Sequence, residues 1–174
     1  MAPPDHERFE RLVLPHLDDA YALAHYLLRD EHDAQDVVHD AVLRALRYFE
    51  SYRDGDARAW LLSIVRNCCY TWRGRREVVG QGHTHGDVTL ADLSDTVAAD
   101  HHAIQSSDRD LVRRAIDMLP HEFREVIVLR ELQELSYKEI STITGVPAGT
   151  VMSRLARARK RLAVALGLPV SEEG

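Results

Sequence analysis

Side chains that can hydrogen-bond to DNA are concentrated near the end of this 174-residue chain. Thr150, Ser153, Arg154 and Arg157 carry short or forked donors of the kind that reach base edges in the major groove. Lys160 follows as a cation suited to a phosphate, and phosphate contacts fix the register that base contacts require. At about 100° per residue, Ser153, Arg157 and Lys160 fall on one side of a helix, with Arg154 at its edge. This spacing predicts a helix that recognises DNA.

The residues around this segment predict the elements that position it. Ser136 followed by Glu139 is the pattern of a capping box, which starts a helix. Gly145 permits the positive φ of a helix end, and Pro147 prevents simple continuation. The apolar residues of the next helix then recur on one stripe, namely Val151, Leu155, Ala158, Leu162 and Leu166. We therefore predict a helix-turn-helix over Leu135–Leu162 with its basic face exposed.

A basic amphipathic helix can also be an ordinary solvated surface, and for an isolated helix the two interpretations would be about equally good. The capped helix and the turn upstream favour DNA recognition here.

Histidines and acidic residues are the candidates for metal binding and catalysis. His83, His85, His101 and His102 lie close together in the sequence, but zinc sites usually need further ligands held by rigid elements. The acidic residues at 36 and 40 share a helix face without a predicted pocket around them. We therefore predict no metal site, no cofactor and no catalytic residue, and keep a metal-dependent enzyme as an alternative.

Composition places the chain among ordinary globular proteins, with 45% hydrophobic and 29% charged residues. No apolar run approaches a membrane span, and the N-terminus lacks the order of a secretory signal, so we expect a cytoplasmic protein without membrane insertion. Cys68 and Cys69 are adjacent, and we interpret them as buried reduced thiols rather than a redox switch. The net charge of −6 does not exclude DNA binding, because the cations gather in local patches.

Helical periodicity covers the chain on both sides of one irregular stretch. We predict helices over Phe9–Leu28, over Asp33–Phe49 with Asp33 as its cap, and over Trp60–Arg76, with Trp60 and Trp72 in the core. The periodicity returns at Asp108, and no strand pattern competes. The prediction is an all-α fold of two small helical domains, 1–79 and 108–174, joined by a flexible linker over 80–107.

Three motifs give the chain a resemblance to bacterial sigma factors of the extracytoplasmic-function (ECF) type, within the sigma-70 family. DAQDVVHDAVLRAL at 33–46 resembles the polymerase-binding helix of that family, and RAWLLSIVRN at 58–67 resembles its promoter-melting helix. LSYKEISTITGVPAGTVMSRLARARKRL at 135–162 resembles its reader of the upstream promoter element. The resemblance covers nearly all of the chain outside the linker.

The resemblance implies functions for three groups of residues. The first domain, resembling sigma region 2, would dock on the clamp helices of core RNA polymerase through Asp36, His39, Asp40 and Arg47. It would recognise and melt the minus-10 element through the loop over 51–56 and the following helix, with Tyr52, Arg53, Asp54, Arg66, Asn67, Tyr70 and Arg73. The second domain, resembling region 4, would recognise the minus-35 element through Thr150, Met152, Ser153, Arg154, Arg157 and Lys160 and would touch the polymerase flap.

The partners implied are core RNA polymerase, promoter DNA and an anti-sigma factor, with the free chain a monomer. The alternative is a dimeric helix-turn-helix regulator that binds an operator without polymerase. The sequence offers no evident dimerisation helix for it.

Overall fold

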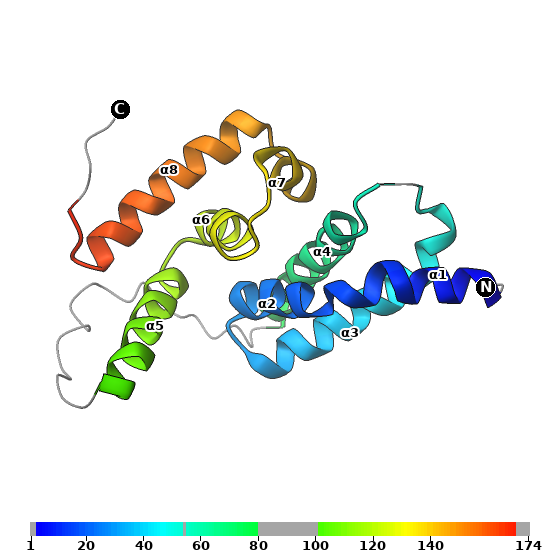
Figure 1. Ribbon diagram of the computed structural model, residues 1–174, viewed down its shortest axis with the longest axis horizontal. Coiled ribbons are helices and arrows are strands. Elements are labelled where there is room, and N and C mark those ends of the chain that lie inside the picture. Colours follow the sequence, from blue (N-terminus) through cyan, green and yellow to red (C-terminus); the bar gives the residue numbers. More distant parts are fainter. Residues whose placement is uncertain (1–2, 54, 80–100, 170–174) are drawn as a thin grey trace.

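The computed structural model describes the backbone of residues 3–53, 55–79 and 101–169. Within these ranges the regular elements are all helical, which confirms the predicted all-α fold (Figure 1). The first domain contains α1 (Pro3–Val13), η1 (Leu14–His16), α2 (Leu17–Leu28), α3 (Glu31–Tyr48), η2 (Phe49–Ser51) and α4 (Ala57–Val78). The second contains α5 (His101–Asp117), α6 (His121–Ile127), the π-helical turn η4 (Val128–Leu132), α7 (Tyr137–Thr144) and α8 (Ala148–Ala165).

Helices α2, α3 and α4 pack on one another and enclose the core of the first domain. Leu23, Leu27, Leu61 and Leu62 are fully buried there, and the small residues of α3 allow close helix packing. Trp60 and Trp72 pack against this core as predicted.

The start of the first domain differs from the prediction in three places, the first being that α1 begins at Pro3 rather than Phe9. The helix predicted over 9–28 is interrupted at η1, because Pro15 has no N–H to donate and its ring crowds the preceding turn. The cap of α3 is Asp30 rather than Asp33, since the Asp30 carboxylate accepts from the Asp33 amide at 2.8 Å.

Helix α4 begins at Ala57, three residues before the predicted start at Trp60. Its cap is Asp56, whose carboxylate accepts from the backbone amides of residues 58 and 59. Cys68 and Cys69 are free thiols on the buried side of this helix, as expected. Burial raises the pKa of Cys69 to about 12.

The helix-turn-helix is present as predicted. Ser136 and Glu139 form a complete capping box, and Gly145 ends α7 in the left-handed region at φ 72°. The stripe of α8 packs inward, with Val151, Leu155 and Ala158 buried against α6 and α7.

Helix α5 starts at His101, seven residues before Asp108, where the sequence predicts that helical periodicity returns. Most of the predicted linker, 80–100, lies outside the described residues.

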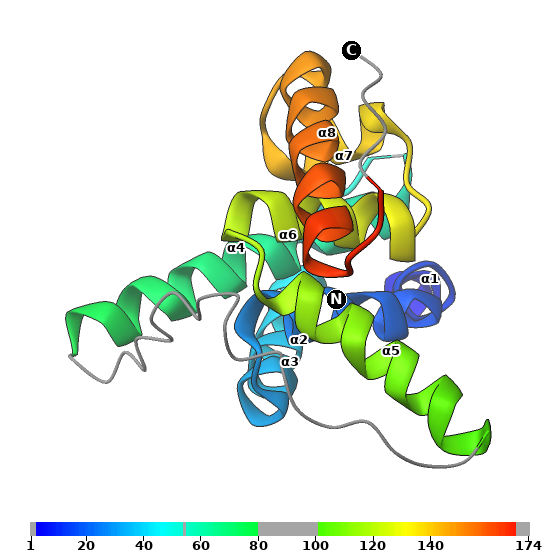
Figure 2. The same ribbon diagram turned by 90° about the vertical axis from the view of Figure 1, so that its left-hand side faces the viewer.

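The two domains pack against each other in this structure. Helix α4 contacts α7, and α2 contacts α6 and η4, so that the buried apolar residues form one continuous cluster. Figure 2 shows α8 and α6 above α2 and α3, with α4 at about the height of α6. None of the described helices is long and apolar enough to span a membrane.

Candidate nucleic-acid interfaces

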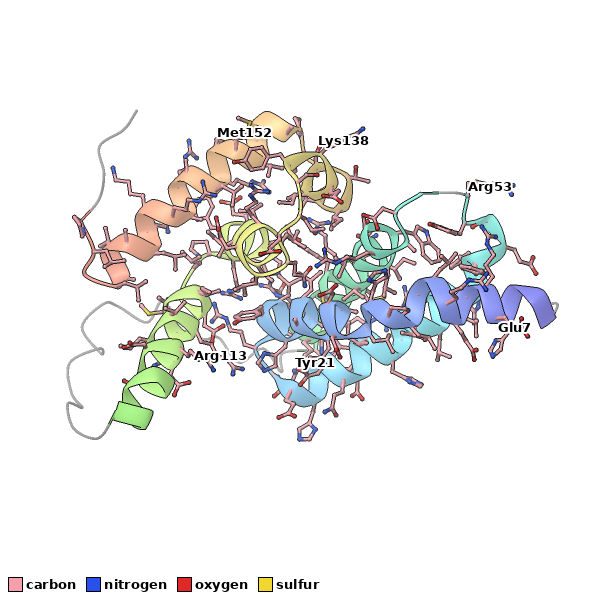
Figure 3. All side chains as sticks on the ribbon, in the orientation of Figure 1. Glu7, Tyr21, Arg53, Arg113, Lys138 and Met152 are labelled. Atoms are coloured by element: carbon pink, nitrogen blue, oxygen red, sulfur yellow. The ribbon has the colours of Figure 1, made fainter. Side chains whose placement is uncertain are left out.

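The outer face of α8 carries most of the predicted minus-35 residues. Met152, Ser153, Arg157 and Lys160 are exposed, and Thr150 is half-buried at the start of the helix. Met152 is 52% exposed and lies at the same end of the second domain as Lys138 (Figure 3). Because short polar side chains, a forked cation and a phosphate-binding cation share this face, it is suited to the major groove.

Other cations of α8 are bound within the second domain. Arg154 forms an ion pair with Glu122 at 3.5 Å, and Arg159 donates twice to one carboxylate oxygen of Glu131. Arg161 lies over the ring of Phe123 at 4.9 Å. Arg154 is one of the predicted minus-35 residues, and in this structure it pairs with α6.

The loop before α4 corrects the prediction for Tyr52. Its ring is 8% exposed, stacks on Phe49 and contacts Trp60, and its hydroxyl donates to the Gly55 carbonyl. It therefore packs in the core and shapes the loop instead of offering a ring to an unstacked base. Arg53 is exposed on this loop (Figure 3), and Asp54 lies outside the described residues.

Arg66 and Tyr70 on α4 face the second domain. Arg66 donates to both carboxylate oxygens of Glu125, and Tyr70 donates to the same carboxylate at 3.4 Å. The guanidinium also lies 4.4 Å from the centre of the Tyr70 ring, and the Tyr70 hydroxyl is 3.0 Å from Nδ1 of His121. Burial raises the pKa of Glu125, and the hydrogen bonds from Arg66 and Tyr70 oppose that rise. We call these four residues the interdomain cluster.

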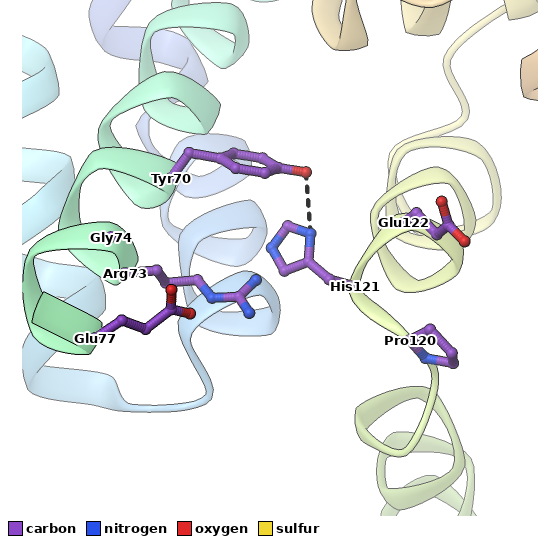
Figure 4. A pocket seen from close by; sticks show the side chains of 7 residues that line it. All are labelled: Tyr70, Arg73, Gly74, Glu77, Pro120, His121 and Glu122. Atoms are coloured by element: carbon purple, nitrogen blue, oxygen red, sulfur yellow. Dashed lines mark hydrogen bonds between the residues drawn. The ribbon is translucent and has the colours of Figure 1, made fainter. Parts of the chain in front are cut away.

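An open pocket of about 510 Å³ lies beside this cluster, between the end of α4 and the start of α6 (Figure 4). Arg73, Gly74 and Glu77 line it from α4, and Pro120, His121 and Glu122 line it from the second domain. Arg73 is half-buried there, whereas Asn67 is exposed nearly two turns closer to the loop.

The predicted polymerase-binding residues share an exposed face of α3. Asp36, His39, Asp40 and Arg47 are all exposed, and Asp40 forms an ion pair with Arg44 at 2.9 Å.

Two exposed apolar side chains, Leu43 and Tyr48, accompany this face and were not predicted as part of it. Leu43, Leu46, Arg47 and Glu50 line a hollow of about 380 Å³ on this side of the first domain. The sequence did carry a signal for Leu43: it lies four residues from both His39 and Arg47, and residues at that spacing share one face of a helix.

Some of the candidate metal ligands lie outside the described residues. Within the described residues, no group of three or more His, Cys, Asp or Glu side chains is placed to hold a metal ion. The histidines of the alternative hypothesis fall outside the described residues at 83 and 85 and outside the described side chains at 101 and 102.

Comparison with known proteins finds a family match for each of the two domains. The family model described as "Sigma-70 region 2" matches residues 12–78, and "Sigma-70, region 4" matches residues 109–162.

Among curated relatives, the "ECF RNA polymerase sigma factor SigM" of Mycobacterium tuberculosis is 35% identical over 164 residues, covering 94% of this chain and 79% of that protein. The "ECF RNA polymerase sigma factor SigE" of Mycolicibacterium smegmatis is 32% identical over 154 residues, covering 88% of this chain and 60% of the relative.

Among solved structures, the sigma factor RpoE of Bartonella quintana, in complex with the anti-sigma factor NepR, superposes with a TM-score of 0.74. The two chains are 28% identical, and the match covers 94% of this chain and 99% of RpoE.

Proposed function

The chain belongs to the family of ECF RNA polymerase sigma factors, and we propose from this membership that it binds core RNA polymerase and directs transcription from specific promoters. The observation that carries the proposal is the capped helix-turn-helix, which exposes the base-reading donors of α8 while a separate domain exposes the acidic face of α3. The family consists of transcription initiation factors, and we propose that this chain is cytoplasmic and acts without enzymatic activity or a cofactor of its own.

We assign each surface a partner. The α3 face would dock on the clamp helices of the polymerase, with Leu43 and Tyr48 adding apolar area to Asp36, His39, Asp40 and Arg47. The α8 face would recognise the minus-35 element. For the minus-10 element we retain a group of five on the loop and on α4, namely Arg53, Arg66, Asn67, Tyr70 and Arg73.

An anti-sigma factor is the third partner that we propose. A related sigma factor was solved in complex with one, and the match covers almost the whole of both sigma chains. The stand-alone regulator is less well supported, because the family match includes the first domain, which such a regulator would not need.

The test is reconstituted transcription with purified core polymerase and a promoter library. We expect transcripts that depend on the added chain and share a sequence upstream of their start sites. Binding to duplex DNA that is tight without polymerase, together with no core-dependent transcript, would favour the alternative regulator.

A further inference from the structure

The loop between η2 and α4 is held by one of its own side chains. The ring of Tyr52 stacks on Phe49 with the ring centres 5.7 Å apart, and it meets the ring of Trp60 at 4.9 Å. From this buried position the Tyr52 hydroxyl crosses the loop and donates to the Gly55 carbonyl. A side chain that two rings hold in place therefore fixes the backbone three residues further along the chain.

Both ends of this loop are fixed as well. At its start, the Tyr52 amide donates to the Phe49 carbonyl at 3.0 Å and ends η2. At its end, the Asp56 carboxylate caps α4 by accepting from two backbone amides of the first helical turn. Arg53 lies between these anchors, and its side chain is exposed. The guanidinium of Arg53 thus extends from a backbone that is held on both sides.

Helix α1 supports the same rings from outside the loop. The guanidinium of Arg8 lies 5.4 Å from the centre of the Phe49 ring and 5.9 Å from that of Tyr52. A cation within about 6 Å of an aromatic face is attracted to it. The match to the sigma-70 region 2 model begins at residue 12, so Arg8 comes from a helix that starts before the matched segment. We call Arg8, Phe49, Tyr52 and Trp60 the loop support.

Each contact of the loop support joins two residues of the first domain, so the support does not require the second domain to pack beside it. Its precision matters for the proposed minus-10 contact. An unstacked base is recognised by hydrogen bonds to its edge, and such donors must be held within about 0.5 Å of their productive positions. A loop that moves would therefore lose the preference for one base over another.

We propose that Tyr52 and Arg8 are positioning residues for minus-10 recognition, which hold the loop so that Arg53 meets the edge of an unstacked base. This inference rests on the proposed function. Tyr52 acts through its hydrogen bond to Gly55, and Arg8 acts by holding the two rings that it covers. Neither side chain has to touch the DNA. A purely structural role would lower the amount of folded protein and would affect all promoters alike, whereas a positioning role changes which base is preferred.

The first experiment measures base preference in reconstituted transcription with core polymerase. The readout is the ratio of transcript from a promoter selected from the library to transcript from its single-base minus-10 variants. Tyr52→Phe removes the hydroxyl and keeps the ring. We expect it to lower the ratio by about three- to tenfold, the factor that corresponds to one net hydrogen bond.

Other properties of Tyr52→Phe should stay close to wild type. Gly55 is exposed, so water can bond to its carbonyl in the variant, and Tm and capture by core polymerase should change little. Tyr21→Phe is the matched control, because it removes a hydroxyl from α2, where the ring stacks on His25. The control should keep the wild-type ratio. A loss of Tm or capture by Tyr52→Phe with an unchanged ratio would mean a structural role and would overturn the proposal for Tyr52.

Arg8→Ala uncovers the two rings and should lower the same ratio. Arg11→Ala, at an exposed position of the same helix, is its charge-matched control and should leave the ratio unchanged. A direct phosphate contact by Arg8 would instead lower transcription from all the promoters alike, because phosphate contacts carry no base preference. That result would overturn the positioning role of Arg8.

A double-mutant cycle tests whether the loop support acts through Arg53. Arg53→Ala should itself lower the ratio, and adding Tyr52→Phe should lower it little further, because no guanidinium is then left to position. Independent losses that multiply would contradict this route. An unchanged ratio for both Tyr52→Phe and Arg8→Ala, with wild-type transcription intact, would overturn the proposal and leave the proposed function standing. Absence of transcription by the wild-type chain would contradict the proposed function itself, and the positioning role with it.

Discussion

Leu155 provides a sharp test of how α8 is held in place. Its side chain is 1% exposed and belongs to the stripe that packs on α6 and α7. Replacing it by alanine removes the transfer free energy of the lost methyl groups and leaves a cavity, which together cost about 2 to 5 kcal/mol for a buried leucine. We expect a loss near 3 kcal/mol for Leu155→Ala, or roughly 6 to 12 °C in Tm for a chain of this size.

Met152 on the same helix is the matched control, because it also carries a large apolar side chain but is 52% exposed. Met152→Ala should change the free energy of unfolding by no more than about 0.5 kcal/mol. Urea denaturation followed by far-UV circular dichroism measures both variants. Similar losses for the two, or a loss below about 1 kcal/mol for Leu155→Ala, would refute the packing described here.

Three further outcomes are expected. Arg157→Ala should weaken discrimination at one minus-35 base pair by about 1 to 3 kcal/mol, whereas Lys160→Ala should weaken binding to all sequences alike. If both variants lost binding equally on all promoters, the assignment of a base contact to Arg157 would be wrong. Asp36→Asn combined with Asp40→Asn should reduce capture by core polymerase in pull-down, and unchanged capture would disprove that docking face. Burial raises the pKa of Cys69 from 9.0 to about 12, so the native thiol should resist iodoacetamide at pH 8. The chain should lose stability as pH rises from about 9 to 12, because the thiol ionises first in the unfolded chain. Equal labelling of the native and the urea-unfolded chain would contradict this.

Local sequence determined the helices and many of their ends. The Ser136 and Glu139 capping box, the left-handed Gly145 and the stripe through Leu155 were all predictable, because caps and helical periodicity act within a few residues. The break at Pro15 had an equally local signal that periodicity alone overlooked. Family motifs then predicted which surfaces meet polymerase and DNA.

Exposure was decided by contacts between distant residues. Tyr52 looked like a loop aromatic, but its ring packs against both Phe49 and Trp60 and is buried. Arg66 lies on the predicted outward face of α4, yet it meets Glu125, 59 residues away in sequence.

The sequence by itself therefore determined which segments are helical and which side chains carry DNA-binding chemistry. Only the tertiary structure decided which of those side chains are covered, because a helix face has no fixed environment until another element packs on it. Glu125 shows the reason most clearly. A charged residue inside an apolar run is tolerated in the core only because folding brings Arg66 and Tyr70 to its carboxylate.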